Sequence, residues 1–215
     1  MNRPLRLATA ALTASAALLL SSCGSGDESQ DDDKIAGAEQ GGEQESKAPS
    51  EPARQVDRPK IELPSDLSYA FQWKKTGDKA KDAVLADRQQ AIQAVDMAIA
   101  DQDPAEKAMR FYHREDAAAE AEKYVRAYVK AQARTTGDYR YYAATVTTDG
   151  GSAALTYCED QSKVYDKYLK KDTIDKSPAT KNSYVLYAAK LRKNEAGVWV
   201  TTKLNATRGS DTCQP

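Results

Sequence analysis

This chain has a single histidine and none of the common glycine-rich nucleotide-binding motifs. A single histidine, His113, excludes a multi-histidine metal centre, and no two of the three cysteines have the spacing of a zinc-ligand pair. There is no Walker loop and no GxGxxG motif, which excludes the commonest nucleotide sites. Ser152 and Ser183 lack the flanking glycines of a hydrolase nucleophile elbow. We therefore expect no metal and no cofactor, and we assign no catalytic residue.

An excess of either charge is also missing. Lysine and arginine number 31 against 32 acidic residues, and the formal net charge is −1. This balance gives no reason to expect a nucleic acid as partner. The apolar run at 7–20 holds 14 residues, whereas a membrane-spanning helix needs about 20.

The first residues have the layout of a secretory signal. Arg3 and Arg6 precede the apolar run, and small residues then lead into Cys23. The sequence Leu-Ser-Ser-Cys at 20–23 resembles the lipobox of bacterial lipoproteins, in which the cysteine receives a diacylglycerol and becomes the mature N-terminus. We expect a signal peptide at 1–22 and a palmitate-type lipid anchor on Cys23. The protein would then lie at the extracellular face of the cytoplasmic membrane.

The number of cysteines fits export. If lipid modifies Cys23, Cys158 and Cys213 remain, and they can pair outside the reducing cytosol. Closing this loop would stabilise the domain by about 4 kcal/mol in the chain-entropy description. The alternative is a pair of buried free thiols.

Composition divides the mature chain into two parts. Residues 24–65 hold 11 acidic and five basic residues and few large apolar ones. Such a segment buries too little apolar surface to offset the entropy of ordering. We expect a disordered tether at 23–65 and a folded domain at 66–215.

The first part of that domain has helical periodicity. Apolar residues recur at helical spacing over 78–100, and the aspartates and proline at 101–104 end this segment. A short helical pattern follows at 104–112 and a second long one at 115–133, and Gly137 is expected to close the helical region. We predict two long helices with a short one between them.

After residue 137 the period changes to two. Asp149-Gly150-Gly151 predicts a hairpin between strands at 139–148 and 152–160. Its inward face would hold the residues Tyr142, Ala144, Val146, Ala153, Leu155 and Tyr157. A second hairpin is predicted from 183–192 and 198–207, with Tyr187 inward and Trp199 on the outer face; 161–181 is expected to be a loop. The order of elements predicts an α+β domain, with helices packed on a curved antiparallel sheet.

This order resembles the nuclear-transport-factor-2-like cone, which SnoaL-like and ketosteroid-isomerase-like proteins share. A closer resemblance is to uncharacterised secreted lipoproteins of high-GC Gram-positive bacteria. It rests on YCEDQSK at 157–163, SYVLY at 183–187, GVW at 197–199 and Cys213. The resemblance implies a fold and a location, and it implies no known activity.

The candidate cavity residues are three tyrosines, Tyr142, Tyr157 and Tyr187. Ketosteroid-isomerase-like enzymes combine a pocket carboxylate with a tyrosine, and we place no carboxylate on the inward face of either hairpin. Without such a carboxylate, the three tyrosines are more typical of core residues whose hydroxyl groups have hydrogen-bonding partners. His113 lies at a helix junction, where we expect a surface or capping role.

Three classes of function remain. We expect a non-catalytic envelope lipoprotein whose cone binds a small ligand or a partner protein. The alternatives are a cone-pocket enzyme of the isomerase or cyclase type, or a structural or assembly factor of the envelope. An inward carboxylate beside an inward tyrosine would favour the enzyme, and a fully packed cone would favour the structural factor.

Replacement of Cys23 tests the anchor. Two acyl chains on one residue give stable membrane attachment. The native protein should therefore partition with membranes on fractionation, and Cys23→Ala should be released or remain unprocessed. Native protein in the soluble secreted fraction, with residue 23 unmodified, would contradict the lipoprotein assignment.

Overall fold

The computed structural model describes residues 56–215. The expected signal peptide, Cys23 and the tether up to residue 55 lie outside this range. Among the described residues, none of the helices has the length and apolar character needed to cross a bilayer.

Three helices precede most of the sheet. Helix α1 spans Lys79–Ala100, α2 spans Lys107–Tyr112 and α3 spans Glu115–Ala131. Asp78 caps α1 because its side chain accepts hydrogen bonds from the backbone amides of Ala80 and Lys81. The predicted helices are confirmed to within a few residues.

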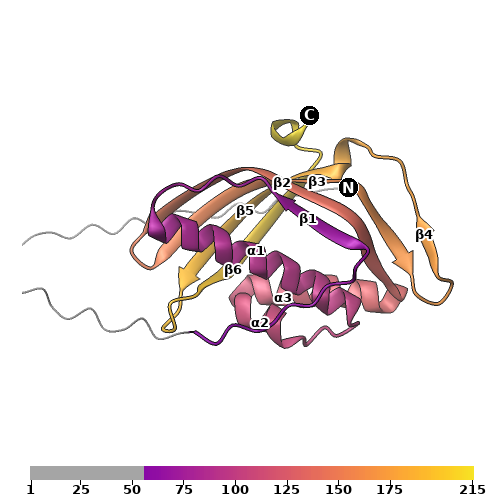
Figure 1. The fold of residues 1–215 in the computed structure, drawn as a ribbon, viewed down its shortest axis with the longest axis horizontal. Helices are drawn as coiled ribbons and strands as arrows, with labels where there is room; N and C mark the ends of the chain where they lie inside the picture. Colours follow the sequence, from indigo (N-terminus) through magenta and orange to yellow (C-terminus); the bar gives the residue numbers. More distant parts are fainter. Residues whose placement is uncertain (1–55) are drawn as a thin grey trace, which may run out of the picture. The chain divides into compact units, whose positions relative to one another are not determined.

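The sheet has six strands in the order β1-β2-β3-β5-β6, and β4 pairs with β3. Their bounds are β1 Leu67–Phe71, β2 Ala133–Asp149, β3 Ser152–Tyr168, β4 Thr173–Asp175, β5 Tyr184–Lys193 and β6 Trp199–Arg208; short 3₁₀ turns lie at Lys181–Ser183 and Asp211–Cys213. Figure 1 shows the sheet curving over the helices, which cover one of its faces. The predicted α+β arrangement is confirmed, as is the turn between Asp149 and Ser152.

Two hydrophobic clusters form the core. One lies between α1 and the inner face of the sheet and includes Leu85, Ile92, Leu155 and Trp199. The other joins α1, α2 and α3 to the start of β6 and includes the side chains of Ile99, Met109, Tyr112, Val125, Val198 and Val200. Helix α1 contributes to both clusters, so its position determines how the other helices meet the sheet.

Strand β1 was not predicted, and it makes the sheet mixed. It pairs with β2 in parallel, with Leu67 opposite Gly137 and Phe71 opposite Tyr141. Gly137, expected to close the helical region, lies instead inside β2. Its φ is 105°, and a Cβ there would lie 2.1 Å from the carbonyl oxygen of Lys163. Only glycine fits this position.

Two β-bulges reverse the predicted orientation of two aromatic residues. Between Tyr142 and Thr145, β2 has one residue more than β3 opposite, and Ala143 takes a φ of 51°. Tyr142 is therefore on the outer face, opposite Cys158, and its assignment to the inward face was wrong. A bulge in β6 at Thr202 likewise turns Trp199 inward, where it is 1% exposed.

The predicted loop at 161–181 is mostly sheet. Strand β3 continues to Tyr168, and the chain then turns back as β4, so that Asp166 lies opposite Asp175. Polar composition concealed this extension, because the residues near its tip are exposed on both sides.

Residues 56–65 run extended and contact the helices. Val56, Ile61 and Leu63 pack on the second hydrophobic cluster. Arg58 forms an ion pair with the buried Asp87 of α1. Contacts with the domain thus begin ten residues before the expected start at 66.

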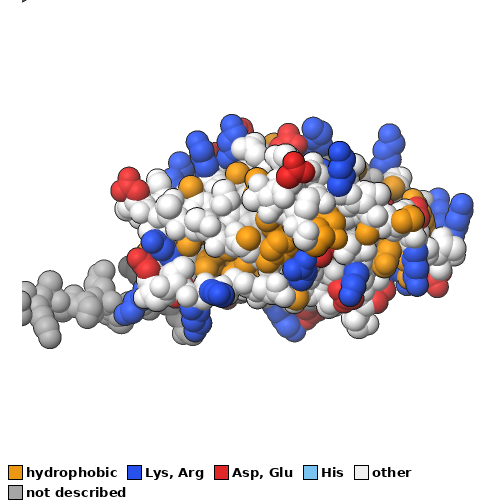
Figure 2. Space-filling view, turned by 90° about the horizontal axis from the view of Figure 1, so that it is seen from above, with side chains coloured by type: hydrophobic (Ala, Val, Ile, Leu, Met, Phe, Trp, Pro, Cys, Tyr) orange, Lys and Arg blue, Asp and Glu red, His pale blue; other side chains and the backbone are white. Residues whose placement is uncertain are grey.

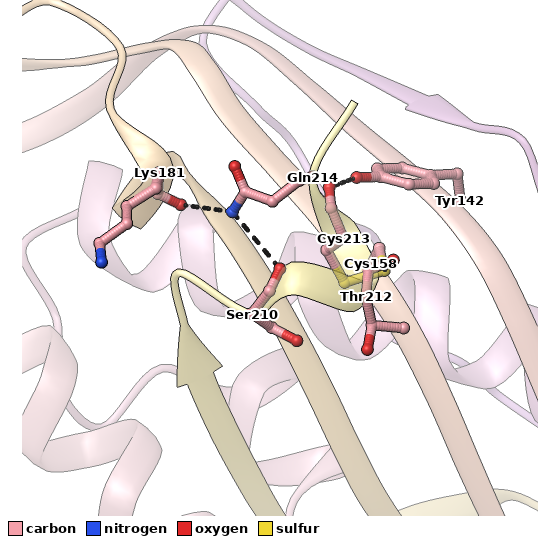
Figure 3. Close-up of a disulfide and its surroundings, with 7 residues drawn as sticks. All are labelled: Tyr142, Cys158, Lys181, Ser210, Thr212, Cys213 and Gln214. Carbon is pink, nitrogen blue, oxygen red and sulfur yellow. Dashed lines mark hydrogen bonds between the residues drawn. A yellow bond between two sulfur atoms is a disulfide. The ribbon is translucent and has the colours of Figure 1, made fainter.

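The predicted pairing of Cys158 with Cys213 is confirmed. Their Cα atoms are 5.5 Å apart, and both residues are buried on the outer side of the sheet. The hydroxyl of Tyr142 donates a hydrogen bond to the carbonyl of Cys213, and the side-chain amide of Gln214 contacts the carbonyls of Lys181 and Ser210 (Figure 3). The disulfide and these hydrogen bonds fix the C-terminal turn on the sheet.

The surface seen in Figure 2 has a central strip of apolar side chains, with lysine, arginine and acidic residues mainly around its edges.

Loss of the disulfide should lower stability. Cys158→Ser/Cys213→Ser removes a cross-link between residues 55 apart in sequence, and the chain-entropy description gives about 4 kcal/mol as an upper figure for the loss. Urea unfolding of the variant and of the reduced native protein should show the same decrease. An unchanged unfolding midpoint in both would contradict this prediction.

Candidate functional site

A cavity of about 730 Å³ lies between the helices and the inner face of the sheet. Helix α1 contributes Ile92 and Val95, α3 contributes Ala117 and Ala121, and the strands β2, β3, β5 and β6 supply the remaining wall. Ligand cavities in proteins are commonly about 300–1,000 Å³. This space can hold an organic molecule of moderate size.

Tyrosines form much of the cavity wall. The rings of Tyr157 and Tyr187 are stacked with centroids 5.2 Å apart, and Tyr141 lies 6.1 Å from Tyr157. Tyr139 and Tyr124 also line the space. Of the three predicted tyrosines, Tyr157 and Tyr187 therefore lie in the cavity, and Tyr142 lies on the opposite face of the sheet.

A buried aspartate from α1 lines the same cavity. Asp96 is 6% exposed and accepts hydrogen bonds from the hydroxyls of Tyr69, at 2.7 Å, and Thr135, at 3.1 Å. Burial raises the pKa of Asp96 to about 7, although these two hydrogen bonds favour the ionised form. Asp96 can therefore gain or lose a proton near neutral pH.

A second carboxyl group, Glu159, projects inward from β3. It follows Tyr157 by two residues and so shares its face, and the side-chain amide of Gln161 donates to it at 2.7 Å. Burial raises the pKa of Glu159, while Gln161 and Tyr187 oppose this shift by hydrogen bonding to the carboxylate. The expectation that the hairpins place no carboxylate inward was wrong.

Signals for both carboxyl groups exist in the sequence. Glu159 continues the alternation of Leu155 and Tyr157, and Asp96 follows Ile92 by four residues on the buried stripe of α1. A charged residue at a core-facing position is uncommon and points to a site.

Arg88 of α1 also lines the cavity and is 3% exposed. Its Nε and Nη2 donate to the hydroxyl of Tyr157 at 3.1 and 2.8 Å, and Nη1 donates to Thr201 at 3.2 Å. These hydrogen bonds connect α1 to β3 and β6. Arg88 was not among the residues expected in the cavity.

His113 is buried, at 2% exposure, and lines the cavity. It is the C-cap residue of α2, so the expected capping role is confirmed and the surface position is wrong. Its Nδ1 lies 2.9 Å from the Met109 carbonyl and its Nε2 lies 3.5 Å from Nη1 of Arg88. Burial, with the charge of Arg88, lowers the pKa of His113 to about 3, so the ring is neutral at neutral pH.

Within residues 56–215, no group of three or more His, Cys, Asp or Glu side chains is arranged to hold a metal ion. The site thus consists of aromatic walls, two carboxyl groups with raised pKa values, and one buried guanidinium.

No protein-family model and no curated protein matches the sequence. Among solved structures, a ketosteroid isomerase-like protein from Erwinia carotovora atroseptica is 14% identical, with a TM-score of 0.44 over 62% of this chain and 98% of its own. An NTF2-like protein with a cystatin-like fold from Novosphingobium aromaticivorans is 16% identical, with a TM-score of 0.39 over 65% and 96% of the two chains. At these scores any functional conclusion must come from the geometry of the site itself.

The protonation of Asp96 should appear in the pH dependence of stability. Its folded pKa, about 7, exceeds the ordinary value of 3.8, so the folded protein retains a proton that the unfolded chain releases. Stability should fall as pH rises from about 4 to about 7. Asp96→Asn removes this loss, so relative to wild type its free energy of unfolding should increase by a few kcal/mol over that range.

Urea unfolding at several pH values measures this difference. Glu159 is present in both proteins, so it enters the difference only through its electrostatic coupling to Asp96. Asp82→Asn is the control: hydrogen bonds from Thr76 lower the pKa of this exposed carboxyl below its ordinary 3.8, so its curve should run parallel to wild type between about pH 4 and 7. Parallel curves for wild type and Asp96→Asn would contradict an elevated pKa.

Proposed function

We propose that this protein is an exported, lipid-anchored envelope protein whose cone binds a small organic molecule without catalysis. The observation that carries the proposal is the open cavity of about 730 Å³ between the helices and the sheet. A fully packed cone would have favoured a structural or assembly factor. Because the cone contains a cavity, that argument for a structural factor does not apply.

The lining has the character of a ligand site. Aromatic faces of Tyr141, Tyr157 and Tyr187 supply apolar area, and Arg88 and Asp96 supply polar groups that fix orientation. Ligand cavities typically combine a mainly apolar wall with a few such groups. The sequence has no motif that identifies a ligand class. This is compatible with ligand binding, because a mainly aromatic cavity wall does not need residues at a fixed spacing in the sequence.

Export and anchoring rest on the sequence of residues 1–23 and find support in the disulfide. A pair such as Cys158–Cys213 persists in oxidising compartments, and it is rare in the cytosol.

A second candidate, a proton-transfer enzyme in the same cavity, is favoured by Asp96. Its carboxyl accepts a hydrogen bond from the Tyr69 hydroxyl, and its pKa of about 7 suits a general acid or base at neutral pH. In this case Asp96 would take a proton from a bound molecule, and the tyrosine hydroxyls of the wall would stabilise the resulting oxyanion.

The fluorescent neutral probe N-phenyl-1-naphthylamine tests whether the cavity binds ligands. The full chain with Cys23→Ser needs no detergent and should bind the probe saturably. Ala121→Trp, on the cavity side of α3, should weaken binding at least about tenfold because the indole fills the space. Ala127→Trp, at an exposed position of the same helix, is the matched control and should bind as wild type. Equal binding by both variants, or none by wild type, would contradict the proposal.

A further inference from the structure

The guanidinium of Arg88 is a buried charge with neutral partners. It contacts the hydroxyls of Tyr157 and Thr201 and the ring of His113, and its Cζ lies 5.6 Å from the centroid of the Tyr157 ring. No carboxylate of residues 56–215 lies within ion-pair distance of it. Buried charges in proteins are usually paired, and arginine cannot become neutral by losing its proton.

The acidic residues near Arg88 do not form an ion pair with it. Asp87, the neighbour in sequence, is engaged by Arg58 and accepts a hydrogen bond from the backbone amide of Trp199 at 2.8 Å. Glu159 is attracted by Arg208 and Arg88 but hydrogen-bonds to Gln161. The positive charge of Arg88 is therefore only partly compensated.

The space beside Arg88 can accept an anion. His113 presents a neutral ring because burial and the charge of Arg88 lower its pKa to about 3. The adjoining walls are the stacked rings of Tyr157 and Tyr187 and the apolar side chains of Ile92 and Leu204. Lys203 and Arg208 also line the cavity, together with Asp116 and Glu120, so the rim carries both signs.

We propose that the ligand of this cavity is an organic anion, with an aromatic or other apolar body against the tyrosines and an oxyanion paired with Arg88. The inference rests on the proposed ligand-binding function and specifies its ligand class. The guanidinium is already oriented by Tyr157 and Thr201, so pairing costs little further ordering. A carboxylate or sulfonate on the ligand would form the ion pair with Arg88 that the described part of the protein does not supply.

Two probes with the same ring system test the charge. 8-Anilinonaphthalene-1-sulfonate differs from N-phenyl-1-naphthylamine by one sulfonate. With the full chain carrying Cys23→Ser, the sulfonate should bind more tightly. Arg88→Met should lower the ratio of sulfonate affinity to neutral-probe affinity about tenfold or more, since a hydrogen bond to a charged group is lost. Arg126→Met removes an exposed arginine of α3 that does not line the cavity, so it is the matched control and should keep the preference.

A competition with wild type alone covers the case in which Arg88→Met fails to fold. 2-Naphthoate and 2-naphthylmethanol have the same rings, and the carboxylate should displace bound N-phenyl-1-naphthylamine at a concentration about tenfold lower or less. Equal displacement would overturn the anion proposal and leave the ligand-binding function standing. A preference that persists in a folded Arg88→Met variant would also overturn it. No binding of the neutral probe would overturn both proposals.

Discussion

The hydrogen bonds between Arg88 and Tyr157 connect the long helix to the middle of the sheet, and much of the architecture depends on them. They place α1 at a fixed distance from β3, and the bond from the Trp199 amide to Asp87 does the same for β6. Polar groups at these positions cost free energy unless each has a partner. The helix is thus held by directional contacts as well as by apolar packing, and the cavity between helix and sheet does not collapse.

This arrangement explains why the wall is built from tyrosine. A ring can cover apolar neighbours while its hydroxyl reaches a polar group, as Tyr69 does with Asp96 and Tyr157 with Arg88. Phenylalanine would remove one hydrogen-bonding partner from each of these two groups. The tyrosines of the wall therefore supply hydrogen-bonding partners for the buried polar residues of α1.

The sequence predicted the features that depend on local periodicity. The helices, both hairpins and the disulfide follow from spacing, turn residues and cysteine number. Strand β1 could not be predicted, because its partner β2 lies some 70 residues away and the pairing is parallel. Tyr142 and Trp199 were misplaced because a bulge reverses the side of every residue beyond it, and nothing in the alternation indicates a bulge. Asp96 and Glu159 were overlooked for a different reason: their spacing from Ile92 and Tyr157 places them on buried faces, but those faces were defined by apolar residues and tyrosines alone.

The extended segment before β1 has a mechanical consequence. Residues 56–65 lie against the helices, and Arg58 is paired with Asp87, which adjoins Arg88 in α1. A pulling force that reaches Val56 along the chain must strain this ion pair before it can act on the sheet. The force would therefore arrive first at α1, the helix that carries Arg88 and Asp96, and only afterwards at β1.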